Sequence, residues 1–168
     1  MKCTALFSAI LYGILPISAC VAQQSNLQPM LTEVIFAGQQ CNLSESSGVI
    51  WINNPQRLEA VLKQTNSHMV AGNPPRAPAV DFVKNAVVAV SMGQQRTGGY
   101  ALEISKSPLQ IENGSATLKL NYRQPGKGMM TIQMITSPCI LIIVPRGDYK
   151  IFRAVTLTGK NIASTTVE

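Results

Sequence analysis

Residues 85–92 read NAVVAVSM, and the apolar residues AVVAV at positions 86–90 form an uninterrupted run. A short apolar run rich in valine is typical of a strand that is buried on both faces. The run follows the acidic-aromatic pair Asp81-Phe82 and precedes a glycine-rich segment at residues 93–100. We therefore expect a central strand here, with the rest of the fold built around it.

Short strand-like segments occur on both sides of this central strand. Their expected ranges are 32–36, 48–52, 100–105, 109–112, 115–122, 129–135, 140–144 and 149–157. Asn113-Gly114 separates two of them and is the strongest short signal for a hairpin. The later segments predict an antiparallel meander. The expected fold class is mainly β with one helix (α+β), as a small antiparallel β-sandwich or barrel.

One segment between these strands has the pattern of a helix. An asparagine at position 53 or 54 can cap its start, and Pro55 suits the first turn because its missing N–H is not needed there. Apolar residues at positions 58, 61 and 62 give the helix one apolar face. We expect it to end near residues 65–66, before a proline-rich loop at residues 66–80.

The first residues have the form of an export signal. Lys2 precedes an apolar run at residues 5–17 that is too short to span a bilayer as a helix. The run ends in ISAC at residues 17–20, which resembles the bacterial lipobox. This resemblance implies that Cys20 is diacylated before cleavage removes residues 1–19. The alternative is ordinary cleavage after residue 19 or 22, which would give a soluble periplasmic or secreted protein.

The lipid-anchored alternative has consequences for the domain organisation and the location. Residues 20–31 would form a tether, and residues 32–168 a single β-rich domain. Residue 21 is valine rather than aspartate, and resemblance to Gram-negative lipoproteins then favours the outer membrane. We expect an envelope protein that is held at the membrane through its lipid and faces the periplasm.

The charge distribution argues against a nucleic-acid partner. The formal net charge is +6, but the positive residues are scattered without a run. Nucleic-acid binding usually needs a basic stripe or patch. We therefore expect a protein partner instead.

Two cysteines remain when the signal and Cys20 are set aside. Cys41 and Cys139 form an even pair in an oxidising compartment, which favours a disulfide between them. The alternative is two separately buried thiols, because free cysteine packs as a small hydrophobic residue.

No catalytic arrangement is recognisable in the sequence. His68 is the only histidine, and no nucleophile elbow, paired carboxylates or metal spacing accompany it. Met129, Met130 and Met134 could bind Cu(I) through their thioethers. However, Met130 and Met134 share one face of the expected strand, which favours core packing. We expect no enzyme activity, no cofactor, no metal and no small-molecule substrate.

Three loop segments are candidates for binding. Residues 93–100 read GQQRTGGY, which is longer than a hairpin needs, and the adjacent glycines permit positive φ. Residues 124–128 and 136–139 also have the composition of shaped turns. Such segments gather as binding loops at one end of some β-sandwiches, and the alternative is that they are only tight connections.

The stretches DFVKNAVVAVSMGQQRTGGYALEI (residues 81–104) and QPGKGMMTIQMITSPC (residues 124–139) resemble the PrcB C-terminal-domain family. The similarity covers residues 81–144 and is carried by Gly93, Thr97, Gly98, Gly99, Tyr100, Pro125 and Pro138. It implies a secreted or lipid-anchored accessory protein without catalytic residues, in a family named for a subunit of a protease complex. Cys139 stands where that family commonly has an aromatic residue, and pairing with Cys41 would explain the departure.

These observations predict a non-enzymatic envelope lipoprotein that binds and stabilises a partner protein, with a protease complex as the implied setting. The expected partner-binding segments contain Arg96, Thr97, Gly98, Gly99, Tyr100, Gly126 and Lys127. Of these, we expect Arg96, Thr97 and Lys127 to make the contacts. Tyr100 alternates with Leu102, so we expect it to pin its loop from inside rather than to touch the partner. An alternative is inhibition of cysteine proteases, because residues 97–100 are similar to the Thr-Gly-Tyr loop of chagasin-type inhibitors. The Arg-Pro-Trp motif of those inhibitors is absent.

Overall fold

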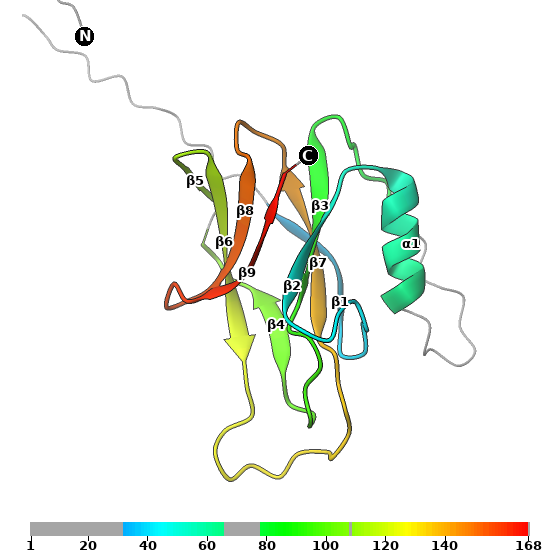
Figure 1. Cartoon of the computed structure of the whole chain (residues 1–168), viewed down its shortest axis with the longest axis vertical. Coiled ribbons are helices and arrows are strands. Elements are labelled where there is room, and N and C mark those ends of the chain that lie inside the picture. Colours follow the sequence, from blue (N-terminus) through cyan, green and yellow to red (C-terminus); the bar gives the residue numbers. More distant parts are fainter. Residues whose placement is uncertain (1–31, 66–77, 108, 168) are drawn as a thin grey trace, which may run out of the picture.

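The computed structural model describes residues 32–65, 78–107 and 109–167, which form two β-sheets and one helix (Figure 1). The first sheet contains, in spatial order, β1 (Glu33–Gly38), β7 (Cys139–Pro145), β3 (Asn85–Ser91) and β2 (Gly48–Ile52), all antiparallel. The second contains, in spatial order, β4 (Ala101–Ile104), β6 (Ser115–Arg123), β8 (Ile151–Thr156) and β9 (Asn161–Thr166). The short strand β5 (Gln110–Glu112) also pairs with β6. The expected mainly β sandwich with one helix is confirmed, as two separate sheets rather than a closed barrel in the described residues.

The helix α1 (Pro55–Thr65) starts where the sequence predicts. The backbone N–H of Arg57 donates to Oδ1 of Asn54 at 2.8 Å, which caps the first turn. Leu58, Val61 and Leu62 are buried against the first sheet. Figure 1 shows α1 on the face of that sheet that is turned away from β6, β8 and β9.

Strand β3 lies between two separate hydrophobic clusters. Val87 and Ala89 belong to the cluster that α1 covers. Val88 and Val90 belong to the cluster between the sheets, which also contains Phe152. Successive side chains of a strand point to opposite faces. The AVVAV run is therefore apolar throughout because both faces of β3 are covered, as the sequence predicts.

The expected antiparallel meander is wrong at one strand pair. Strands β6 and β8 are parallel, with Ser115 opposite Ile151 and Leu120 opposite Thr156. After β6 the chain crosses to the first sheet, forms β7, and only then returns to the second sheet. Such a crossover connection allows parallel pairing. Strand β9, which pairs with β8, has no counterpart among the expected strands.

Two connections change sheet at the same end of the molecule. The first is the β3–β4 loop (residues 92–100), and the second is the β6–β7 loop (residues 124–138). They lie together because Ser91, the last residue of β3, is opposite Cys139, the first residue of β7. The chain enters β1 at the other end, since Glu33 is opposite Ile143 and Gly38 is opposite Cys139.

Candidate functional site

The two crossover loops are hydrogen-bonded to each other. Gln95 and Thr136 exchange backbone hydrogen bonds of 2.7 and 2.9 Å, and the N–H of Gly98 donates to the carbonyl of Ile132 at 2.9 Å. The Thr136 hydroxyl also donates to the carbonyl of Thr97. Figure 1 shows both loops at the end of the sandwich opposite β5. The two loops, which contain the glycine and proline residues of the family pattern, are thus one structural unit.

Glycines allow this close approach. Gly93 has φ +73°, and a Cβ there would lie 2.5 Å from the carbonyl carbon of Ser46. Gly99 has φ +90°, and a Cβ there would lie 3.2 Å from Cβ of Pro125. Both positions need a backbone conformation that other residues rarely adopt. The Gly93 and Gly99 positions of the family pattern therefore have a geometric reason in this fold.

The β6–β7 loop exposes an unusual amount of apolar surface. We define the apolar loop surface as five side chains that are between 50% and 100% exposed: Met129, Met130, Ile132, Met134 and Ile135. The expected strand at residues 129–135 is therefore wrong, as is the expected core packing of Met130 and Met134. No strand forms because these residues have only isolated backbone hydrogen bonds within the described part of the chain, such as that from Met129 to Gly126.

A groove of about 420 Å³ lies between the two loops. It is lined by Gly98, Gly99, Pro125, Met129, Met130 and Ile132, among others. The N–H of Gly126 contacts Sδ of Met129 at 3.2 Å, which holds the turn against the methionine. The groove thus joins both glycine segments to the apolar loop surface.

The structure brings the predicted contact residues together at this end. Arg96, Gly99, Gly126 and Lys127 are exposed, while Thr97 and Gly98 are half-buried. Tyr100 is half-buried and packs against the cluster between the sheets, as its alternation with Leu102 suggests. Whether these residues contact a partner stays a prediction.

The third candidate segment, at residues 136–138, is not a binding loop. Thr136 and Ser137 are 3% and 1% exposed, and their backbones bond to Gln95 and Gln39. The hydroxyl of Ser137 accepts the N–H of Asn42. The segment is buried because it fastens the β6–β7 loop to the residues that follow β1.

The disulfide between Cys41 and Cys139 is present. Both cysteines are buried, and the N–H of Cys41 donates to the carbonyl of Ser137 at 2.8 Å. The bond therefore joins the chain after β1 to the start of β7, directly behind the β6–β7 loop. The alternative of two separate thiols is excluded.

The charges around the loops are mostly positive and unpaired. Arg123 pairs with Glu103 at 3.5 Å, but Arg96 and Lys127 form no ion pair with any described residue. Glu45 is an exposed acidic residue on this side, and its carbonyl accepts the N–H of Gln94. The apolar loop surface therefore has a basic rim.

The apolar loop surface was not predicted from the sequence, because residues 129–135 have the pattern of a strand. The useful signal was their position between a glycine-rich turn at 124–128 and the proline at 138, without a hairpin turn that could supply a neighbouring strand.

In the part of the chain described here, no cluster of three or more His, Cys, Asp or Glu could hold a metal ion. No described helix is long and apolar enough to cross a membrane.

Several predictions concern residues outside the described ranges. The signal segment 1–19, the acylation of Cys20, the tether 20–31 and His68 all lie there. They stay predictions.

Comparison with known proteins gives a match to a family model. No curated protein and no solved structure matches the chain. One family model matches a continuous segment that starts in β3 and ends with β7, and it includes both crossover loops. Residues 86–145 of this chain match the family described as PrcB C-terminal, the family that the sequence resembles.

Proposed function

We propose that this protein is a non-enzymatic envelope lipoprotein that binds and stabilises a partner protein, in the setting of a protease complex. The family match supports the accessory role. The observation that carries the proposal is the apolar loop surface. Large exposed apolar patches on soluble proteins mark sites of interaction with proteins or membranes.

The charges at the rim favour a protein with acidic residues as the occupant. An anchor at Cys20 would lead into β1 at Glu33, which lies at the opposite end of the sandwich from both crossover loops. Exposed Arg96 and Lys127 at the rim of the apolar loop surface suit a partner with acidic residues around an apolar centre.

The inhibitor alternative has less support. The chagasin-type inhibitors that residues 97–100 resemble use three loops, and the third segment here, residues 136–138, is buried. An assay with papain separates the two functions. Inhibition at micromolar protein would favour the alternative and contradict the accessory role.

The experiment is crosslinking in native membranes followed by mass spectrometry. A loop variant carries Met130→Ser, Ile132→Ser and Ile135→Ser, and a control variant carries Val83→Ser and Leu157→Ser, which are also exposed apolar residues. We expect the loop variant to lose at least about tenfold of the specifically captured partner, while the control keeps it. Because all five side chains are exposed, each substitution should change the free energy of unfolding by about 0.5 kcal/mol or less.

Equal capture by the loop variant and the control would contradict the proposal. The same membranes test the anchor. An acylated N-terminal peptide beginning at Cys20 would support the lipoprotein, whereas a mature chain beginning at Gln23 would contradict it.

A further inference from the structure

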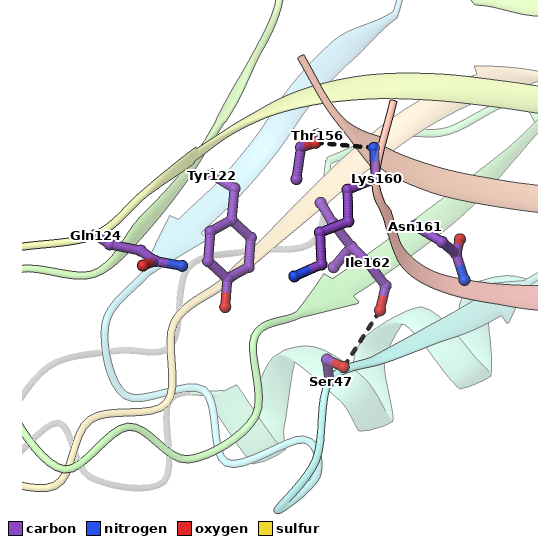
Figure 2. A pocket seen from close by; sticks show the side chains of 7 residues that line it. All are labelled: Ser47, Tyr122, Gln124, Thr156, Lys160, Asn161 and Ile162. Carbon is purple, nitrogen blue, oxygen red and sulfur yellow. Dashed lines mark hydrogen bonds between the residues drawn. The ribbon is translucent and has the colours of Figure 1, made fainter. Parts of the chain in front are cut away.

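A small polar pocket opens beside the apolar groove. It has a volume of about 210 Å³ and is lined by Ser47, Tyr122, Gln124, Thr156, Lys160 and Asn161, together with Ile162. They come from the end of β6 and the residue after it, from the end of β8, from the turn between β8 and β9, from the start of β9, and from the residue before β2. Figure 2 shows the Gln124 amide and the Lys160 side chain on either side of the Tyr122 ring.

Two of the polar groups already have partners. The Ser47 hydroxyl donates to the carbonyl of Ile162 at 3.2 Å (Figure 2). The Thr156 hydroxyl lies 2.9 Å from that of Thr158 and accepts the N–H of Lys160 at 3.1 Å. These contacts fix the walls of the pocket and hold the backbone of Lys160 in place.

Besides the Asn161 amide, which points away from the Tyr122 ring in Figure 2, three groups of the lining are left with hydrogen-bonding capacity. The Tyr122 hydroxyl, the Gln124 amide and the Lys160 ammonium form no hydrogen bond or ion pair with any residue that the structure describes. Burial, and to a lesser extent nearby Tyr100, raise the pKa of Tyr122, so its hydroxyl is a hydrogen-bond donor at neutral pH. All three groups can therefore donate hydrogen bonds to an acceptor in the pocket.

The charge of the lining selects the kind of acceptor. Lys160 is the single cation among the lining residues, and none of them is acidic. One ammonium and two neutral donors match a singly charged carboxylate, which accepts several hydrogen bonds. A phosphate group carries about two charges at neutral pH and is usually met by more than one cation.

We propose that this pocket binds a carboxylate of the partner that covers the apolar loop surface. Gln124 lines both the pocket and the apolar groove, so one peptide segment can occupy the two sites together. The pocket thus defines the partner segment as apolar side chains next to a carboxylate. This assignment of the carboxylate to the partner rests on the proposed function.

The test uses NMR titration of the mature chain without any partner, with sodium propionate as the probe. We expect the amide signals of Gln124, Lys160 and Asn161 to shift and saturate with propionate, and to shift at least about tenfold less with propionamide at equal concentration. Equal shifts from the two compounds would overturn the proposal. Tighter binding of inorganic phosphate than of propionate would overturn the assignment to a carboxylate.

Variants show whether the pocket residues are responsible. Lys160→Met should weaken propionate binding at least about tenfold and Tyr122→Phe about threefold, whereas Lys106→Met, an exposed lysine outside the pocket, should leave it unchanged. Unchanged binding by a folded Lys160→Met protein would overturn the proposal. If Tyr122→Phe disturbs the fold, the Lys160 and Lys106 variants decide alone.

The outcome is distinguishable from that of the proposed function. Propionate binding involves no partner. If propionate does not bind but partner capture still depends on the loop residues, only the proposed carboxylate site is contradicted. Propionate binding without loop-dependent capture removes only the partner-binding role. Acetyl-leucine, with a main-chain carboxylate, and acetyl-aspartate amide, with a side-chain carboxylate, then distinguish a chain terminus from an acidic residue by their relative affinities.

Discussion

Gly93 and Gly114 adopt nearly the same backbone conformation in different surroundings. Their φ angles are +73° and +71°. A Cβ at Gly93 would lie 2.5 Å from the carbonyl carbon of Ser46 and 2.7 Å from the carbonyl oxygen of Glu45, whereas nothing lies within 4 Å of a Cβ at Gly114. Both glycines avoid the cost of positive φ, but only Gly93 also avoids a collision with backbone. Comparing the two positions therefore separates the cost of a positive φ from the cost of a collision with neighbouring backbone.

We expect Gly114→Ala to lower the free energy of unfolding by about 1 kcal/mol, the cost of a left-handed conformation. Gly93→Ala should lower it by about 2–4 kcal/mol, because the collision adds overpacking to the same backbone cost. Urea denaturation measures both values. Equal losses in the two variants would show that the approach of residues 45–46 does not constrain this position.

At the scale of elements, local signals were sufficient where the structure is local. The capping asparagine and Pro55 located α1, and Asn113-Gly114 located the β5–β6 hairpin, where Glu112 is opposite Ser115. The AVVAV run located β3 because a strand that is buried on both faces has an apolar residue at every position. Fold class followed from these elements together.

Pairing between distant segments was not visible in the sequence. Met130, Ile132 and Met134 alternate like a strand, but a strand also needs a neighbour, and the chain supplies none. The parallel pairing of β6 with β8 likewise depends on β7 crossing to the other sheet. Neither the missing neighbour of residues 130–134 nor the parallel pairing can be predicted from local composition.

The same limit applies to the candidate site. Glycine and proline patterns identified both crossover loops and the residues Arg96, Gly99 and Lys127. The pocket at Lys160 was missed because β9 was missed. A signal existed, since Gly159 lies in a turn with φ +84° just before a segment, NIASTT at residues 161–166, that is rich in β-forming residues.

The turn between β7 and β8 depends on Tyr149. Its hydroxyl donates to the carbonyl of Pro145, and its ring meets Trp51 edge-on at 6.1 Å. The pKa of Tyr149 is raised to about 12, because the effect of burial is larger than the opposing effect of nearby Arg146. Between pH 10 and 12 the folded protein therefore keeps a proton that the unfolded chain loses. The stability contribution is complete below pH 10 and is lost as the pH rises to about 12.

Urea denaturation at pH 9 and pH 11.5 tests this effect with Tyr149→Phe as the comparison. The wild type should lose about 2 kcal/mol more than the variant over this range. At pH 9 the variant should already be about 1 kcal/mol less stable, because it lacks the hydrogen bond to Pro145. Parallel pH profiles of the two proteins would contradict the raised pKa.

At the scale of the whole molecule, the strand directions put different connections at the two ends of the sandwich. The chain enters at one end through Glu33, where the connection from β7 to β8 also passes between the sheets, and the β3–β4 and β6–β7 loops pass between the sheets at the other end. The two clusters that flank β3 hold the first sheet between α1 and the second sheet. Loops that join such a framework at both their ends can expose apolar side chains without collapsing onto the core.

The disulfide is the covalent link in this arrangement, and it joins residues 98 positions apart. Closing a loop of this length restricts the unfolded chain strongly, with about 3–5 kcal/mol as the expected contribution. We expect the double variant Cys41→Ala and Cys139→Ala to lose this amount in urea denaturation. Wild type unfolded in the presence of dithiothreitol should lose a similar amount, because both then lack the cross-link.

The two treatments should differ without denaturant. Cys41 and Cys139 are 0% and 1% exposed, so dithiothreitol reaches them only when the structure opens. Native protein should therefore keep its disulfide in dithiothreitol for much longer than protein near the urea midpoint, as alkylation and mass spectrometry would show. If the double variant loses less than about 1 kcal/mol, the hydrogen bonds of Ser137 and Thr136, rather than the cross-link, hold the β6–β7 loop to the framework.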